Sequence, residues 1–327
     1  MDSVLFVVRG DATIPSCRFR AYQFAEPLRE LGVAAEFFVE GRRESAWDWI
    51  RTTSRLVGRV AKNPYRAVVY MKRLQPERIF LMRMLNRNVW YDFDDAVYLG
   101  HGFRFGQSVR AAGGVIAGNE ELAQRARRHG ARVEVIPTAV EVPEKYQIPD
   151  LDGPLYISWM GTAGNLHYLE PVLEAVDSIR RDGVRAVLHV LTEQPERAPQ
   201  KAGVVAESWS PEAEQKTLSR CHLGVMPLSD DAWSRGKCAC KALQYLSYAR
   251  PVVCSPVGIN IPLFENKAFG RLATDTRDWI DVFKTWNSSR EDMVRVGLLG
   301  REFVEEQYSV QRWARTLRDL LLGEESV

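Results

Sequence analysis

The sequence predicts an α/β protein of two domains, each with a parallel β-sheet, that face each other across a cleft. Short apolar segments rich in β-branched residues alternate with amphipathic segments along all 327 residues, which is typical of parallel sheets with helices on both faces. The chain is also too long for one ordinary hydrophobic core, so two domains are expected. The expected strands are Val4–Val8, Ala34–Val39, Ala67–Met71, Val89–Asp92, Gly114–Ala117 and Arg132–Ile136 in the first half, and Leu155–Met160, Ala186–Leu191, Val204–Glu207, Leu223–Pro227 and Pro251–Ser255 in the second.

A polar, proline-rich stretch between Pro143 and Pro154 indicates the boundary between the domains. Proline lacks a backbone N–H and disfavours helix, so this stretch is expected to be a linker. We predict a first domain over residues 1–148, a second over 149–308 and a terminal segment over 309–327. The helices expected from apolar residues at helical spacing include Arg20–Leu31, Glu120–His129 and Val310–Leu322.

Composition and charge exclude several classes of protein. The net charge is +2, and the excess of Lys and Arg in residues 1–150, 23 against 18 acidic residues, is too small to favour a nucleic-acid partner. No apolar stretch is long enough to span a membrane, and the N-terminus is typical of a strand and not of a signal peptide. Five scattered cysteines favour reduced thiols in a cytoplasmic protein. Cys238 and Cys240 lack a second ligand pair, so no metal site is expected from them.

Three carboxylates follow the strand expected at Val89–Asp92. Asp92, Asp94 and Asp95 lie within four residues, and such closely spaced negative charges repel each other, so stability alone does not favour the cluster. Alternation along a strand would place Asp92 and Asp94 on one face and Asp95 on the other. Ligands of open α/β sheets bind beyond the carboxyl ends of the strands, which favours binding of sugar hydroxyls or of an acceptor. A Mg²⁺ site and the capping of a following helix are the alternatives.

A polar, glycine-containing loop with two lysines follows the strand expected at Leu223–Pro227. Lys237 and Lys241 are expected one turn apart near the start of a helix, where like charges repel each other and oppose the helix dipole. A bound diphosphate would remove both penalties, and Gln244, one turn further on, would reach a ribose. A solvated basic face is the alternative.

Other small or polar residues follow the expected strands. Gly10 allows a backbone to approach a phosphate, or it is an ordinary turn glycine. Thr162 and Gly164 lie in a small-residue loop, and the helix expected after it would direct its amides at an anion. Asn119 either caps the next helix or contacts a ligand, and Thr138 follows the last strand of the first domain.

A basic stripe at helical spacing precedes the strand expected at Ala67–Met71. The stripe fits contact with the inner surface of a membrane near a lipid-linked acceptor, and the mildly basic first half of the chain fits anionic lipid or a phosphorylated acceptor. A solvated helix face over core residues is the alternative. The stripe consists of Arg51, Arg55, Arg59 and Lys62 beside Trp47, Trp49 and Ile50.

The order of these motifs resembles that of the GT-B glycosyltransferases, specifically glycosyltransferase family 4, over nearly the whole chain. The branch that it resembles carries Arg-x-Arg after the first strand, and Asp-Phe-Asp-Asp in place of a His-Asp pair, with Asp94 at the position of the histidine. The matching segments are Arg18-Phe19-Arg20, Asp92-Phe93-Asp94-Asp95, Asn119-Glu120, Ile136-Pro137-Thr138, Trp159-Met160-Gly161-Thr162, Ser208-Trp209-Ser210-Pro211-Glu212 and Gly236-Lys237.

This resemblance implies two Rossmann-like domains, the first for an acceptor and the second for a donor, with a last helix that packs back onto the first. It implies a hexosyltransferase that moves a sugar from a UDP- or GDP-linked donor to a glycan, lipid-linked or small-molecule acceptor, with retention of configuration and without an obligatory metal or other cofactor. With the patterns above, the catalytic residues are Asp94, Asp95 and Lys237. The donor-binding residues are Gly10, Thr162, Gly164, Ser208, Trp209, Arg235, Gly236, Lys241 and Gln244, and the acceptor-side residues are Arg18, Arg20, Asp92, Asn119 and Thr138.

Two departures from the family leave other functions open. The glutamates of its E-x₇-E motif fall on Gly236 and Gln244, and its Asn-Gly after Pro137 is Thr138-Ala139. A catalytically silent nucleotide-binding or partner subunit of the same architecture is therefore one alternative, which the retained Asp cluster and lysines oppose. A sugar-nucleotide epimerase is a weaker alternative, because few carboxylates and histidines are placed for acid–base chemistry. The absence of a G-x-G-x-x-G fingerprint disfavours a dehydrogenase.

Overall fold

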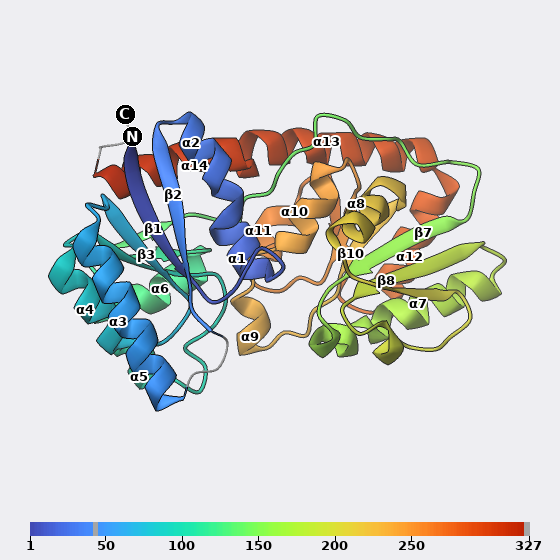
Figure 1. Ribbon diagram of the computed structural model, residues 1–327. Coiled ribbons are helices and arrows are strands. Elements are labelled where there is room, and N and C mark those ends of the chain that lie inside the picture. The colour runs from blue at the N-terminus through green and yellow to red at the C-terminus, as the bar shows by residue number, and fades with distance from the viewer. Residues whose placement is uncertain (42–44, 324–327) are drawn as a thin grey trace. The chain divides into compact units, whose positions relative to one another are not determined.

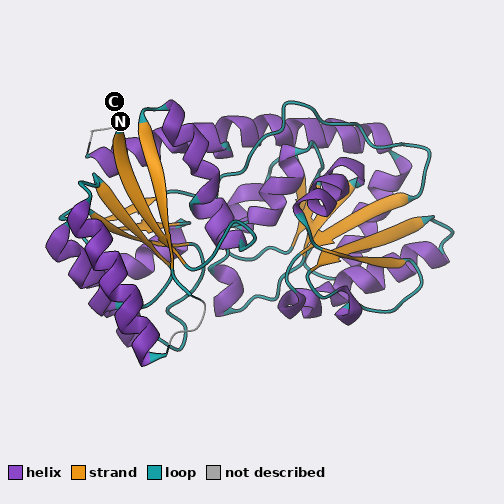
Figure 2. Ribbon diagram, in the orientation of Figure 1, coloured by secondary structure: helices purple, strands orange, loops and turns teal. Residues whose placement is uncertain are grey.

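Two separate parallel sheets organise the chain, and helices flank each of them (Figures 1 and 2). The computed structural model describes residues 1–41 and 45–323. The α/β architecture with two parallel sheets is confirmed. The chain divides into unit 1, which comprises Met1–Ala139, Arg235–Cys238 and the stretch from Tyr308 onward, and unit 2, which comprises Val140–Ser234 and Ala239–Gln307.

The sheet of unit 1 has the strand order β2-β1-β3-β4-β5-β6. All six strands lie where the sequence predicts them, and those buried on both faces, such as β1 and β3, are continuous apolar runs. The central β1 pairs on both sides, with Val4 opposite Ala35 of β2 and Ala67 of β3. The strands are β1 (Asp2–Val8), β2 (Val33–Val39), β3 (Ala67–Met71), β4 (Val89–Phe93), β5 (Gly114–Ala117) and β6 (Val133–Val135).

Helices cover both faces of this sheet. Helices α3 to α6 pack on one face around residues such as Leu56, Ile79 and Phe105, and α1, α2 and α14 pack on the other around Leu28 and Leu317. The helices are α1 (Pro15–Arg20), the 3₁₀ turn η1 (Tyr22–Phe24), α2 (Ala25–Glu30), α3 (Ala46–Lys62), α4 (Pro76–Leu85), α5 (Gly102–Ala111), α6 (Glu120–Arg127) and α14 (Val310–Leu322).

The prediction of one continuous helix over Arg20–Leu31 is wrong. The structure divides this segment among the end of α1, η1 and α2. The break falls at Ala21, whose φ of −138° and ψ of −67° are not helical, and Pro27 lies in the first turn of α2, where its missing N–H is tolerated. The last predicted helix is confirmed, since α14 spans Val310–Leu322 and packs against α2 within unit 1.

The sheet of unit 2 has the order β12-β11-β10-β7-β8-β9. The strand order reverses at β7 and β10, and ligands of open α/β sheets bind at such a switch point. The sequence did not predict β12, because Gly270-Arg271-Leu272 contains a single apolar side chain and so shows no apolar run. The strands are β7 (Leu155–Met160), β8 (Ala186–Thr192), β9 (Val204–Ser208), β10 (Leu223–Met226), β11 (Val252–Cys254) and β12 (Gly270–Leu272).

In unit 2, α7, α12 and α13 cover one face of the sheet around Trp279 and Trp286, and α8 and α10 lie against β7, β8, β10 and β11. Residues 143–154 contain no helix or strand, as their prolines predict. Across the described ranges, no helix has the length and apolar character that crossing a membrane requires. The helices are η2 (Ala163–Leu169), α7 (Glu170–Arg181), η3 (Pro195–Arg197), α8 (Pro211–Arg220), α9 (Ala232–Arg235), α10 (Cys240–Ser247), α11 (Asn260–Phe264), α12 (Thr276–Ser288) and α13 (Arg290–Tyr308).

Candidate active site

A buried ion pair anchors the carboxyl end of β4 in unit 1. Arg20, at the end of α1, donates from Nε to Asp92 Oδ1 at 3.1 Å and from Nη2 to Asp92 Oδ2 at 2.5 Å. Its Nη1 donates to the carbonyls of Ile136 and Pro137. Burial raises the pKa of Asp92, and the charge of Arg20 opposes that rise. Both side chains are almost fully buried, so this pair holds three segments together beneath the surface.

Asp94 and Asp95 converge on a lysine that the sequence analysis did not single out. Lys72 follows β3 directly, and its Nζ lies 2.7 Å from Asp94 Oδ1 and 2.5 Å from Asp95 Oδ2. Its backbone has φ of +57°, the left-handed conformation that costs free energy in a residue other than glycine and is found disproportionately at functional sites. The backbone therefore adopts an unfavourable conformation where the ammonium group reaches both carboxylates.

The charges around Lys72 fix the ionisation of the cluster. Burial by itself would raise the pKa of Asp94, but the charges of Lys72 and Arg20 outweigh it and lower that pKa. Burial raises the pKa of Asp95, and Lys72 and Lys237 lessen the rise. Attraction to the two carboxylates outweighs burial at Lys72 and raises its pKa, so Lys72 is charged at neutral pH.

Neither alternative for the Asp cluster is supported. The next helix, α5, begins only at Gly102, so these aspartates cap no helix. The expected alternation is also wrong, because β4 ends at Phe93 and both Asp94 and Asp95 face Lys72. In the part of the chain that the structure describes, no group of three His, Cys, Asp or Glu side chains is arranged to hold a metal ion.

The segment Arg235–Cys238 packs against the Asp cluster within unit 1. Asn119 caps α6 by accepting from the backbone N–H of Leu122, and its Nδ2 donates to the carbonyls of Gly236 at 3.3 Å and Lys237 at 3.0 Å. The two interpretations of Asn119 are thus compatible. A Cβ on Gly236 would lie 2.8 Å from the Cβ of Ala96, so only glycine allows this approach. The contacts bring Lys237 toward Asp95, where its charge lessens the rise in the pKa of that carboxyl that burial causes.

The expectation that Lys237 and Lys241 share one helix is wrong. Lys237 lies between α9 and α10, and Ala239, the residue before α10, has φ of +52°. This left-handed residue turns the chain, so only Lys241 lies on α10. Arg235 is the exposed last residue of α9.

The other predicted residues of unit 1 differ in exposure. Gly10 packs closely, since a Cβ there would lie 2.3 Å from Ile14 Cδ1. Arg18 is half-buried, with its guanidinium 4.4 Å from the ring centre of Phe19. Thr138 is buried, and its hydroxyl has no hydrogen-bond partner among the described residues.

In unit 2, the loop after β7 differs from the expectation. The segment with Thr162 and Gly164 enters the 3₁₀ turn η2, and α7 begins only at Glu170, so no long helix starts at the loop. The backbone N–H of Ala163 nevertheless donates to both carboxylate oxygens of Glu193 at 3.1 Å. The carboxylate of Glu193 therefore already binds the first amide of the turn. The partial positive charge at the N-terminus of a helical turn favours such a negative group.

The remaining predicted donor residues meet in a second cluster around Glu214 of α8. The indole N–H of Trp209 donates to Glu214 Oε2 at 2.9 Å, and Gln244 Nε2 donates to Glu214 Oε1 at 2.9 Å. Lys241 Nζ donates to Gln244 Oε1 at 2.9 Å and lies 3.5 Å from Glu214 Oε2. Ser208 is the exposed last residue of β9, next to Trp209. A buried carboxylate thus orients three residues that the sequence assigns to the donor.

Solved structures with the same architecture were found, although no family model and no curated protein sequence matches the chain. HepE of Anabaena, in complex with UDP and glucose, superposes with a TM-score of 0.74 at 11% identity over 98% of this chain and 99% of its own. Sucrose-phosphate synthase of Thermosynechococcus elongatus gives 0.74 at 13% identity over 98% of both chains. The lipopolysaccharide outer core galactosyltransferase WaaB gives 0.66 at 11% identity over 98% and 99%.

The chain has the GT-B fold. This assignment rests on the nearly complete coverage of both chains by structures that share few identical residues with this one. In this GT-B chain the two polar clusters follow β4 of unit 1 and β9 of unit 2, where parallel sheets bind ligands.

Sequence reasoning missed two residues of these GT-B clusters. Lys72 was detectable as a lysine placed directly after a buried strand, like the predicted residues that follow β4. Glu214 gave no such signal, because an acidic residue in the first turn of α8 is an ordinary helix feature. Only the packing of α8 beside α10 reveals that it contacts Lys241 and Gln244.

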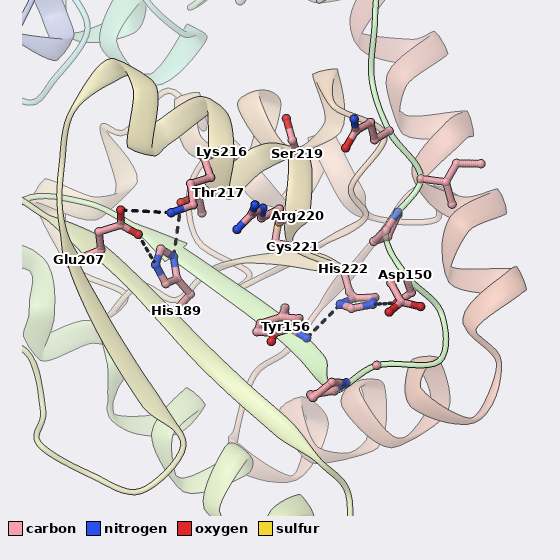
Figure 3. Close-up of a pocket in the computed structure, with 15 residues that line it drawn as sticks. Asp150, Tyr156, His189, Glu207, Lys216, Thr217, Ser219, Arg220, Cys221 and His222 are labelled. Atoms are coloured by element: carbon pink, nitrogen blue, oxygen red, sulfur yellow. Dashed lines mark hydrogen bonds and ion pairs between the residues drawn. The ribbon is translucent and has the colours of Figure 1, made fainter.

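A cavity of about 490 Å³ in unit 2 is separate from both clusters (Figure 3). It lies beside α8 and the segment before β7, and none of the predicted site residues lines it. Here His189 Nε2 lies 3.1 Å from Glu207 Oε2, and His222 accepts from the backbone N–H of Tyr156. Burial lowers the pKa of His222 to about 4, so this histidine is neutral at physiological pH and supports the backbone.

Proposed function

We propose that the protein is a retaining glycosyltransferase of the family 4 type. It would move a sugar from a UDP- or GDP-linked donor to a hydroxyl of a glycan, lipid-linked or small-molecule acceptor. The GT-B fold supports a sugar transferase, and HepE, which shares this fold, forms complexes with UDP and glucose and with UDP-glucose. The observation that carries the proposal is the Lys72–Asp94–Asp95 cluster in unit 1, which stability alone does not favour.

The proposal assigns a separate task to each part of the chain. Residues 1–148 would bind the acceptor and residues 149–308 the donor, and residues 309–327 would complete the first domain. The placement of α14 in unit 1, where its Leu321 carbonyl accepts from Asn88, supports the last assignment.

Several predicted residues supply groups suited to a nucleoside diphosphate. Lys241 would neutralise the diphosphate, together with Arg235 and Lys237, as the bond between the anomeric carbon and the phosphate oxygen breaks and its electron pair passes to the leaving nucleotide. Gln244, oriented by Glu214, would bind ribose hydroxyls. The remaining donor contacts would come from Ser208, Trp209, Thr162, Gly164, Gly236 and Gly10.

Asp94 and Asp95 would bind and orient the acceptor. A carboxylate whose pKa is lowered, as that of Asp94 is, is a weak base, so we assign it to hydrogen bonding of an acceptor hydroxyl. The proton of that hydroxyl would pass to the departing phosphate as the new glycosidic bond forms. Arg20 and Asp92 would support this site from below, and Arg18, Asn119 and Thr138 would lie at its edge.

The silent-subunit alternative is favoured by the residues at the positions of the family's paired glutamates. Gly236 has no side chain, and Gln244 carries no charge, so neither can act as a carboxylate. Glu214 weakens this alternative, because it brings a carboxylate to the side chain of Gln244 at 2.9 Å.

Calorimetric titration with UDP and with GDP tests the donor assignment. A charge-assisted hydrogen bond contributes about 1.5–3 kcal/mol, so Lys241→Ala should weaken binding by roughly tenfold to a hundredfold. Lys216→Ala, which removes an exposed lysine of α8 at the separate cavity, is the matched control and should bind as the wild type does. Equal affinities for wild type and Lys241→Ala would contradict the assignment.

A further inference from the structure

Large apolar side chains gather at the surface of three neighbouring helices of unit 1. Trp47 on α3, Met84 on α4 and Phe103 on α5 are 81%, 69% and 77% exposed. Helix α4 packs against both α3 and α5, and Figure 1 shows the three along one side of the sheet. Of the fifteen large apolar side chains exposed in the described residues, seven lie on these helices or just before α5. These are Trp47, Ile50, Phe80, Met84, Leu85, Leu99 and Phe103.

The same helices concentrate positive charge. Helices α3, α4 and α5 contain eight Lys and Arg residues and two acidic residues, a net charge of +6, whereas the whole chain carries +2. Six of the cations are exposed at the surface: Arg51, Arg55, Lys62, Arg83, Arg104 and Arg110. Apolar side chains interspersed with cations match the two layers of an anionic bilayer surface, where acyl chains lie beneath charged headgroups.

The surface is continuous with the edge of the sheet that carries the Asp cluster. Trp47 lies in the first turn of α3 and Phe103 in the first turn of α5, and both helices begin at the carboxyl edge of the parallel sheet. Leu99 lies in the loop that links Asp95 to α5. Apolar groups are therefore exposed next to the carboxylates, where a lipid carrying a polar headgroup would have to enter.

We propose that the outer surface of α3, α4 and α5 docks on an anionic lipid bilayer, with Trp47 and Phe103 inserted among the headgroups. The cations attract the surface electrostatically, and the apolar side chains leave water on insertion. Docking on a bilayer selects a lipid-linked acceptor from the acceptor classes of the proposed function. Only this choice of acceptor rests on the proposed function. Membrane docking itself requires no nucleotide and no transfer reaction.

Flotation with lipid vesicles tests the proposal. The wild-type protein should float with vesicles of phosphatidylcholine and phosphatidylglycerol, remain unbound with phosphatidylcholine alone, and dissociate as salt is raised. Trp47→Ser with Phe103→Ser should lower the partition coefficient at least about tenfold through lost insertion. Arg51→Glu with Arg55→Glu should lower it at least about tenfold through lost attraction.

Matched controls lie on unit 2. Val205→Ser with Ile261→Ser removes exposed apolar side chains, and Lys267→Glu with Arg277→Glu reverses exposed charges; both should bind vesicles as the wild type does. Melting temperatures establish that each variant is folded, and nucleotide titration of the same samples tests the proposed function separately.

Three results would overturn the docking proposal. The wild type could fail to float with anionic vesicles, or the variants on α3 and α5 could float as well as the controls. Sedimentation could also reveal self-association that Trp47→Ser with Phe103→Ser abolishes, which would make this surface an interface between copies of the chain.

Discussion

Replacing Lys72 by methionine tests the arrangement of the Asp cluster. The change removes the ammonium group from between Asp94 and Asp95 and keeps most of the apolar length of the side chain. The side chains of Lys72, Asp94 and Asp95 are 11%, 14% and 27% exposed, so solvent screens the remaining carboxylates weakly. Removing one partner of a buried ion pair costs about 3–5 kcal/mol, and the partial exposure of Asp95 favours the lower end. At roughly 2–4 °C for each kcal/mol, the melting temperature should fall by about 6–12 °C.

The loss should depend on pH in a definite direction. Without Lys72, burial and mutual repulsion raise the pKa of Asp94 above its unfolded value, so the folded variant binds more protons than the unfolded chain and becomes more stable as pH falls from about 8 to about 5. In the wild type the pKa of Asp94 is lowered, so its contribution is present above the unfolded pKa of about 4 and is lost as pH falls through the folded value. Lys72 also lessens the rise in the pKa of Asp95, so the difference between the proteins reports on both carboxylates. The difference in the free energy of unfolding between the wild type and Lys72→Met should become smaller toward pH 5.

Calorimetric unfolding across this pH range measures both effects. Lys284→Met is the matched control, because Lys284 forms an ion pair of 2.7 Å with Asp182 in which the side chains are 46% and 50% exposed. Lys284→Met should change the melting temperature only slightly, because solvent screens an exposed ion pair. The change should also lack the pH dependence expected for Lys72→Met. The reasoning is refuted if Lys72→Met and Lys284→Met lose equal stability, or if the loss at Lys72 is the same at every pH.

Four further substitutions test other residues of the two clusters and of the fold. Asp94→Asn should lower turnover with little change in nucleotide affinity, measured by sugar-transfer kinetics and calorimetry, and unaltered turnover would make Asp94 purely structural. Glu214→Gln should weaken nucleotide binding by about 1–2 kcal/mol, because Gln244 and Lys241 lose a charged partner; unchanged calorimetric affinity would contradict the role of this carboxylate. Gly297→Ala should lower the free energy of unfolding by at least about 2 kcal/mol, since its Cβ would lie 2.1 Å from the carbonyl oxygen of Ala249. Gly58→Ala, in an open position of α3, should instead raise it by about 0.4–1 kcal/mol in the same denaturation assay.

The strands were predictable because burial on both faces leaves a direct mark in the sequence. Segments such as Val4–Val8 and Ala67–Met71 are apolar throughout, and β1 and β3 lie there in the structure. Helix breaks were less predictable, since the apolar spacing of residues 20–31 continues through Ala21, where the backbone leaves the helical conformation. β12 was not predictable, because its sequence Gly-Arg-Leu has a single apolar side chain.

The candidate site was predictable where a charge directly follows a strand, and not where it arrives from a distant segment. The Asp cluster after β4 has this signal, but the contacts of Asn119 with Gly236 and Lys237 join segments more than a hundred residues apart. The helix expected through Lys237 and Lys241 is interrupted by a turn at Ala239, because this residue has the left-handed conformation. Alanine rarely adopts that conformation, so no sequence pattern indicates it.

Binding of a nucleotide-linked sugar by this chain is measured by thermal unfolding with a panel of UDP- and GDP-linked sugars. A ligand at about 100 times its dissociation constant stabilises the folded protein by about 2.7 kcal/mol. Donors of one base should raise the melting temperature clearly, and Lys241→Ala, with its tenfold to hundredfold weaker binding, should reduce the stabilisation to about 0.4–1.4 kcal/mol. If no member of the panel raises the melting temperature, the transferase proposal is contradicted and the silent-subunit alternative replaces it.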